Sequence, residues 1–119
     1  MKSGVSDIRR KAAVTSSMRE LYPEIEALFQ SHADELDDFT GTYRFQVTDQ
    51  NISYGGRLNA GIYSRLGENE NADVTVSATD ADFLNLLTGK LSLPKAMLLR
   101  RVKVKGNLHI LTGFARFLN

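Results

Sequence analysis

The sequence contains no cysteine, only two histidines and two prolines, and no long uninterrupted run of apolar residues. A chain without cysteine has no disulfide, no thiolate nucleophile and no cysteine-ligated metal. Since no stretch approaches the roughly 20 apolar residues of a transmembrane helix, we predict no membrane span. Residues 1–18 include basic and small side chains but no apolar core, so we predict no signal peptide and expect a cytoplasmic protein.

Signatures of catalysis are missing as well. His32 and His109 fall in predicted helices far apart in the sequence, and neither has a partner at a metal-ligand spacing, so we expect no metal site. The segment TGK at 88–90 lacks the first glycine and the following Ser or Thr of a phosphate-binding loop. The acids at 34–38 fit a solvated helix end better than a tuned acid–base pair. We therefore expect no enzyme activity and no cofactor.

Acidic residues are absent from the last part of the chain. All 14 acids lie at or before Asp82, where they outnumber 8 cations, whereas the last 37 residues hold seven cations and no acid. This asymmetry favours an anionic partner such as lipid headgroups, a phosphate or nucleic acid, and the alternative is a solvated basic face balanced by the acidic part. No aromatic residue is interleaved with the cations at 90–105, so we expect no nucleic-acid partner.

The first third of the chain predicts one long helix. Residues 1–16 carry little pattern and are predicted to form a mobile segment or a loose helix, followed by a single domain over 17–119. Ser17 and Glu20 match a capping box at a helix start. Pro23 then either interrupts this helix or begins a fresh one. An apolar stripe at helical spacing follows, and we expect the helix to end near 33–36.

Strands are predicted next. GTYRFQVTD alternates cleanly, with Tyr43, Phe45 and Val47 on its apolar side. ISYGGRLNAGIYSRLGE predicts two strands joined by a tight turn, with a bulge at the paired glycines Gly55 and Gly56. ADVTVSA and RRVKVKG predict two more strands, the second with its valines inward and its cations outward.

Three helices are predicted in the last third. TDADFLNLLTG has a cap at Thr79 or Asp80 and ends at Gly89, and SLPKAMLL is a short helix opened by Pro94. NLHILTGFARFLN is a closing helix capped by Asn107. Together these elements predict an α+β fold, in which helices cover one face of a mostly antiparallel sheet.

Apolar residues are concentrated at the helical end of the chain. Fifteen large apolar side chains lie within the 36 residues from 83 to 118. They either form an ordinary core, or they line a cavity for a lipid because helices and sheet do not close completely. Met97 would suit an adaptable cavity wall. Gly113, in the middle of the predicted last helix, would let another group approach closely.

The order of short motifs resembles the sterol carrier protein type-two (sterol-binding domain) family. These motifs are ADVT at 72–75, DFL at 82–84, TGK at 88–90 and KGN at 105–107. GTYRFQVTD also resembles the first strand of that family, and the likeness extends over about residues 24–118. It implies a five-stranded, mostly antiparallel sheet with helices over one face, enclosing a hydrophobic tunnel that holds sterols, fatty acids, acyl-CoA or other lipids without catalysis.

Matching positions imply which residues bind the lipid. Those that would line or border the tunnel are Leu84, Leu87, Leu91, Met97, Leu98, Leu111 and Phe114. The family often has an aromatic pair followed by glutamine in the short helix, where this chain has Met97, Leu98 and Leu99, which predicts a different ligand shape. The pair at 100–101 resembles a bacterial branch that assists ubiquinone synthesis and handles isoprenoid lipids.

We therefore expect a small lipid carrier. Its exposed cations would draw it to anionic membranes or hold an anionic headgroup; they are Arg100, Arg101, Lys103 and Lys105. Two alternatives remain open. One is an interaction module that docks a lipid or quinone biosynthetic enzyme without carrying cargo, and it predicts an exposed apolar patch. The other is an enzyme, or an accessory domain of one, acting on acyl chains.

Overall fold

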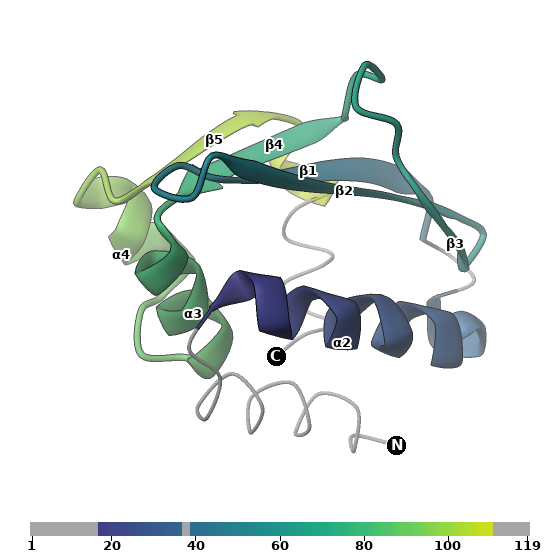
Figure 1. Cartoon of the computed structure of the whole chain (residues 1–119). Coiled ribbons are helices and arrows are strands. Elements are labelled where there is room, and N and C mark those ends of the chain that lie inside the picture. The colour runs from purple at the N-terminus through teal and green to yellow at the C-terminus, as the bar shows by residue number, and fades with distance from the viewer. Residues whose placement is uncertain (1–16, 37–38, 111–119) are drawn as a thin grey trace.

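The computed structural model describes residues 17–36 and 39–110 and contains a five-stranded sheet with all its helices on one face (Figure 1). The strands lie in the order β3-β2-β1-β4-β5. In chain order, the elements are α2 (Met18–Ser31), a 3₁₀ turn (Ala33–Leu36), β1 (Gly41–Val47), β2 (Ile52–Asn59), β3 (Ile62–Arg65), β4 (Val74–Ala78), α3 (Asp80–Thr88), α4 (Leu93–Leu98) and β5 (Val102–Gly106).

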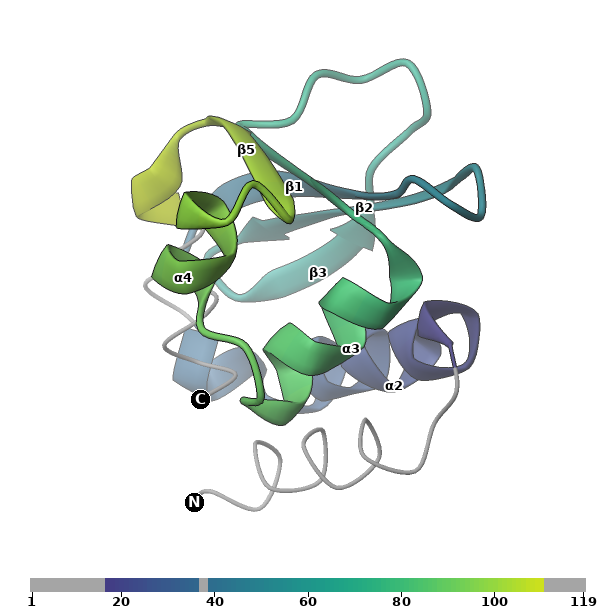
Figure 2. The ribbon, with the colours of Figure 1, turned by 90° about the vertical axis from the view of Figure 1, so that its left-hand side faces the viewer.

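The central strands β1 and β4 pair in parallel, and the other three pairings are antiparallel. The predicted α+β class, with about five mostly antiparallel strands and helices on one face, is confirmed. Figure 2 shows α4 beneath β5, and α3 beside α2 beneath the sheet. The helices therefore cover different parts of one inner face.

Alternation along the strands decides which side chains face the helices. Tyr43, Phe45 and Val47 are buried as predicted, because inward positions recur every second residue along a strand. In β5, Val102 is buried and Val104 half-buried, while Lys103 and Lys105 are exposed. The predicted inward valines and outward cations are thereby confirmed.

The paired glycines do not form the predicted bulge. The β1–β2 pairing runs through both glycines without a skipped residue, and the β2–β3 pairing begins at Gly56. Gly56 instead lies directly opposite Tyr43, and a Cβ on it would collide with the phenol, coming within 2.5 Å of the ring Cζ. The glycine is needed for space, because the Tyr43 ring lies across the neighbouring strand.

Helix α2 begins as predicted, with the Glu20 N–H donating to Ser17 Oγ at 3.3 Å. Pro23 lies inside this continuous helix, so both predicted alternatives, an interruption and a fresh helix beginning there, are wrong. Proline removes one backbone donor, but the apolar stripe on both sides of it is buried against the sheet and stabilises the helix. The α-helix ends at Ser31, and the 3₁₀ turn occupies the predicted end region.

The ends of α3 and the start of α4 also agree with their predicted signals. Thr79 Oγ1 accepts from the Asp82 N–H at 3.2 Å, and Gly89 closes α3 with a φ of 83°. Pro94 lies in the first turn of α4, where a missing N–H costs nothing. Asn107 Oδ1 accepts from the His109 N–H at 3.0 Å as a helical turn starts at residue 108.

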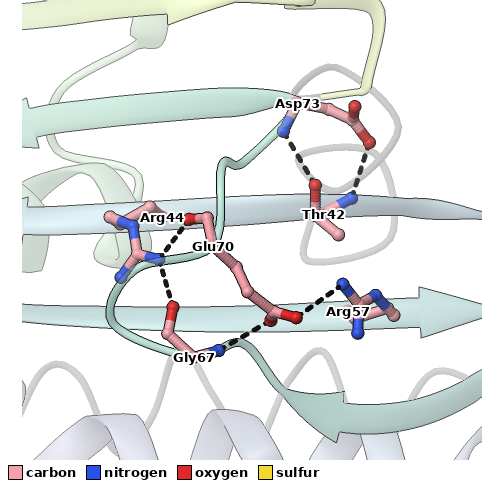
Figure 3. Close-up of polar contacts among 6 residues, drawn as sticks. All are labelled: Thr42, Arg44, Arg57, Gly67, Glu70 and Asp73. Carbon is pink, nitrogen blue, oxygen red and sulfur yellow. Dashed lines mark hydrogen bonds and ion pairs between the residues drawn. The ribbon is translucent and has the colours of Figure 1, made fainter.

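A loop over residues 66–73 crosses the outer face of the sheet. Arg65, Gly56, Tyr43 and Val74 pair at one level across four strands, so the chain passes sideways over β2 and β1 to reach β4. Figure 3 shows polar contacts holding this loop: the Arg44 guanidinium donates to the carbonyls of Gly67 and Glu70 at 2.7 and 2.9 Å.

The side chain of Glu70 also fixes the loop, since it accepts from the Gly67 N–H at 2.9 Å and pairs with Arg57 at 3.5 Å (Figure 3). At the far end, Thr42 and Asp73 exchange two hydrogen bonds of 3.0 and 2.7 Å. The outer face is thus polar where the loop crosses it, and an apolar ligand is better accommodated on the inner face.

Some sequence-based expectations lie outside the described residues. These are the mobile segment at 1–16, the closing helix beyond Ile110, and within it Leu111, Gly113 and Phe114.

Replacing Gly56 with alanine tests the close approach of Tyr43. The added methyl group would overlap the phenol, so we expect Gly56→Ala to lower the free energy of unfolding by about 1–3 kcal/mol. The matched control is Gly67→Ala, whose Cβ would meet its nearest neighbour at 3.5 Å. The control should change stability by less than about 0.5 kcal/mol in urea unfolding. Equal effects of the two substitutions would contradict the steric account.

Candidate functional site

Helix α2 and strands β1 to β3 enclose an aromatic part of the inner face. The Tyr22 and Tyr54 rings stack with centroids 4.4 Å apart, and Phe29 lies 6.0 Å from Tyr43. Phe45 continues the row toward α3, with its centroid 4.8 Å from that of Tyr43. Large rigid rings therefore fill the space between α2 and the sheet.

A chain of polar groups runs through this aromatic part. The hydroxyls of Tyr22 and Tyr43 share a hydrogen bond of 2.7 Å, and the Tyr22 hydroxyl oxygen lies 3.5 Å from that of Tyr63. Tyr63 donates to Glu26 Oε2 at 2.5 Å, and the Arg65 guanidinium donates to both carboxylate oxygens at 3.0 and 3.1 Å. We call these five residues the phenol–carboxylate chain. Among the described residues, no buried side-chain nitrogen or oxygen lacks a hydrogen-bond partner.

The ionisation states in the chain follow from burial and from these bonds. Burial raises the pKa of Tyr22, Tyr43 and Tyr63 far above the ordinary value, so the phenols stay neutral. Burial also acts to raise the pKa of Glu26, but hydrogen bonds from Arg65 and Tyr63 outweigh it and the pKa is lowered. Glu26 is therefore an ionised and fully engaged acceptor, which suits a structural role better than proton transfer.

The other half-buried apolar side chains that pack on the core, apart from Phe39, form an aliphatic set. They come from α3, the start of α4, β5 and the turn after it. We call this set the aliphatic shelf: Leu84, Leu86, Leu87, Leu93, Val104 and Ile110. Ile110 reaches the first residue of β1, since a Cβ on Gly41 would lie 3.0 Å from its Cδ1. The chain after β5 thus turns back beneath the sheet.

The two carboxylates at the start of α3 hold the helices together. Asp80 Oδ1 accepts from the Met18 N–H at 2.7 Å, which caps α2 with a residue of another helix. Asp82 pairs with Arg101 at 3.2 Å and so ties α3 to the turn between α4 and β5. Of the two predicted caps of α3, Thr79 takes that place, and Asp80 caps α2 instead.

A small cavity of about 180 Å³ lies at the N-terminal end of α2. Its walls combine apolar and polar groups: Ser17, Met18, Arg19, Val47, Gln50, Ile52, Tyr54 and Asp80. This volume is below the roughly 300 Å³ at which ligand pockets usually begin. None of the residues predicted to bind lipid lines it.

The structure separates the predicted lipid-binding residues by exposure. Leu84 and Leu87 are half-buried on α3, Leu91 is buried in the core, and Met97 and Leu98 are exposed on α4, by 37% and 83%. Leu111 and Phe114 lie outside the described residues. Whether these seven residues share one tunnel stays a prediction.

The predicted headgroup contacts differ in ion pairing instead. All four are exposed, but Arg101 also pairs with Asp82, whereas Arg100, Lys103 and Lys105 form no such pair within the described residues. The sequence interpretation missed the phenol–carboxylate chain altogether. Its one local signal is Glu26, a charged residue on the buried stripe of α2 that also holds Tyr22 and Phe29.

Two features are absent from the described part of the chain. No helix in it is long and apolar enough to cross a membrane. No group of three or more metal-ligating side chains occurs within residues 17–36 and 39–110.

A model of the SCP-2 sterol transfer family matches residues 24–119, and no curated protein matches the chain. Among solved structures, the sec-alkylsulfatase Pisa1 from Pseudomonas sp. is similar with a TM-score of 0.73 and 23% identity, over 92% of this chain but only 17% of that enzyme. The ubiquinone synthesis protein UbiJ-SCP2 is similar over 79% of this chain and 89% of that one, with 22% identity and a TM-score of 0.63. Palmitated SCP2L2 from Aedes aegypti has a TM-score of 0.63 and 15% identity, over 87% and 96%. At these identities the three likenesses show the fold alone.

Glu26→Gln tests the charge of the phenol–carboxylate chain. The folded pKa of Glu26 lies below its ordinary value of 4.5, so its stabilising effect is present above that pH and is lost as pH falls through the folded pKa. We expect the substitution to lower the free energy of unfolding by about 1–3 kcal/mol at neutral pH. The difference should disappear in acid, where wild-type Glu26 is also neutral.

The matched control is Glu68→Gln, which removes an exposed acid and should change stability by less than about 0.5 kcal/mol. Urea unfolding of wild type, Glu26→Gln and Glu68→Gln, from neutral pH to below the pKa of Glu26, measures both effects. A difference between Glu26→Gln and wild type that persists undiminished in acid would show that the carboxylate charge is not what stabilises the chain.

Proposed function

Because the chain belongs to the SCP-2 sterol transfer family, we propose that it is a non-catalytic lipid-binding protein whose cargo lies in an apolar tunnel between the sheet and helices α3 and α4. The family match covers all five strands and nearly all of the helical face, so it includes the aliphatic shelf. The fold also occurs within the alkylsulfatase, but as only 17% of that chain, which gives no reason to transfer that activity here.

The observation that carries the proposal is the contrast between the two parts of the inner face. The part beneath β1 to β3 is occupied by rings and a saturated hydrogen-bond chain, and the cavity beside it at the start of α2, of about 180 Å³, is small for an acyl tail. The aliphatic shelf has only carbon side chains, and its members are half-buried rather than fully packed. An apolar tail that covered them would remove further apolar surface from water.

The physical gain is large enough for a useful affinity. Each methylene group buried contributes about 0.8 kcal/mol, so about ten methylene groups correspond to micromolar binding before any headgroup contact. Leu84 and Leu87 are the best-placed members of the predicted lipid-binding set, since both lie on the shelf. The exposed cations Arg100, Lys103 and Lys105 are proposed to meet an anionic headgroup or membrane.

The similar structures suggest the class of cargo. The mosquito protein is described with palmitate, which supports a fatty-acyl ligand for this chain. The likeness to a ubiquinone synthesis protein supports an isoprenoid lipid as the other candidate. A carrier that relies on apolar burial discriminates weakly between such chains, so we propose a lipid class rather than one cargo.

A second candidate function is an accessory module that assists a quinone or lipid biosynthetic enzyme without carrying cargo. The same likeness to the ubiquinone synthesis protein favours it, as do the exposed side chains of Met97, Leu98 and Leu99. It differs from the first proposal in one respect, because it requires no lipid inside the domain. Lipid binding in the absence of any partner therefore separates the two.

Leu87→Trp tests the site on the shelf. A tryptophan there would occupy the space proposed for the tail, and we expect about a tenfold loss of affinity for a fatty acid, since overfilling an apolar site costs about 1–3 kcal/mol. The matched control is Ser53→Trp, which places the same side chain at an exposed position of β2. Titration of delipidated protein with palmitate gives the affinities. If Leu87→Trp binds palmitate as tightly as wild type, the proposed tunnel is wrong.

A further inference from the structure

Three consecutive large apolar side chains protrude where α4 ends. Leu98 is 83% exposed, Leu99 51% and Met97 37%. Figure 1 shows α4 and the turn into β5 at one end of the molecule, away from α2 and β3. We call residues 95–103 the α4 corner. Leaving three such side chains in water in one short segment is unfavourable, so a partner that covers them would be stabilised.

The backbone of the α4 corner holds these side chains in a fixed arrangement. The Arg101 N–H donates to the carbonyl of Ala96 at 2.9 Å, and the Arg100 N–H to that of Met97 at 3.1 Å. This pair of bonds is the Schellman motif, which closes a helix with one residue in the left-handed conformation. Ala96 is fully buried and Arg101 is paired with Asp82, so both ends of the turn are anchored.

Arg100 occupies the left-handed position of this motif, with a φ of 60°. Glycine is the usual residue there, because a side chain makes this conformation unfavourable. The Arg100 side chain is exposed, so burial does not offset the conformational cost. A cation at a strained and exposed position next to exposed leucines points to an interaction outside the domain.

Other cations surround the leucines. Lys95 precedes Leu98 and Leu99 by three and four residues, which places it on the same face of α4. Lys103 follows at the start of β5 and is exposed. Within the described residues, no carboxylate forms an ion pair with Lys95, Arg100 or Lys103. The corner thus combines protruding apolar side chains with unbalanced positive charge.

We propose that the α4 corner is a membrane-docking surface, at which Leu98 and Leu99 insert among the lipids of an anionic bilayer while Lys95, Arg100 and Lys103 contact phosphates. This inference rests on the proposed lipid function, since a carrier must meet a membrane to exchange cargo. Protein interfaces usually bury about 800 Å² on each partner, which a short convex turn does not offer. Interfacial binding needs only a few apolar side chains together with basic ones.

Fluorescence provides the first test, because the chain contains no tryptophan. Leu99→Trp would place a single reporter at the corner, and Ile62→Trp would place one on β3, at a residue that is 71% exposed. We expect vesicles of phosphatidylcholine mixed with phosphatidylserine to shift the emission of Leu99→Trp to the blue, and that of Ile62→Trp to stay unchanged. An unshifted Leu99→Trp, or equal shifts at both positions, would overturn the proposal.

Affinity for the same vesicles provides the second test. We expect Lys95→Gln to weaken binding about fivefold, and Leu99→Ser about tenfold or more. Ile62→Ser, the matched loss of an exposed apolar side chain, should leave binding unchanged. Arg100→Gly removes the left-handed strain, so its unfolding midpoint should stay or rise while vesicle binding falls about fivefold. Vesicle binding that all these variants retain would contradict docking by this corner.

Palmitate titration without vesicles separates this inference from the proposed function. Lys95 is not among the predicted cargo contacts, so Lys95→Gln should bind palmitate as wild type does. If wild type binds palmitate but its vesicle binding is insensitive to both Lys95→Gln and Leu99→Ser, only the docking inference fails. If wild type binds vesicles through the corner but takes up no palmitate, the carrier function fails and the docking surface stands.

Discussion

The close approach of the Tyr43 phenol to the backbone at Gly56 is the contact on which the inner face of this domain depends. Because the glycine has no side chain, the ring can lie across the neighbouring strand, and its hydroxyl meets that of Tyr22 on α2 at 2.7 Å. From there the phenol–carboxylate chain continues through Tyr63 and Glu26 to Arg65 at the sheet edge. A buried polar chain is tolerated only when its members are paired, so these bonds fix where α2 lies on the sheet.

The consequence is a division of the inner face into a filled part and an aliphatic part. Rings occupy the space beneath β1 to β3, while the half-buried aliphatic shelf is formed by residues of α3, the start of α4, β5 and the turn after it. The loop over residues 66–73 crosses the outer face, where Arg44 and Arg57 hold it (Figure 3). The proposed cargo site on the shelf includes Leu93 of α4, so it would lie close to the α4 corner. Uptake of cargo and contact with a membrane would then occur at neighbouring parts of one molecule.

Local patterns predicted much of this architecture because they express local physics. The alternation of Tyr43, Phe45 and Val47, the cap at Ser17 and the closing Gly89 depend on neighbours a few residues away. Gly56 was misinterpreted as part of a bulge because its partner, Tyr43, lies on another strand. The phenol–carboxylate chain joins α2, β1 and β3, and such contacts leave almost no trace in a local window. The exposure of Leu98 and the burial of Leu91 likewise depend on how α4 meets β5, which short-range spacing does not determine.

The central claim is that this domain holds a lipid inside it, and native mass spectrometry of freshly purified protein followed by lipid extraction tests that claim most directly. The account predicts a bound mass that extraction identifies as a fatty acid or an isoprenoid lipid, or one that reappears when delipidated protein is incubated with mixed lipids. A protein that keeps its bare mass under both conditions would contradict the account. The aliphatic shelf would then be ordinary core, and an accessory role without cargo would be the better description.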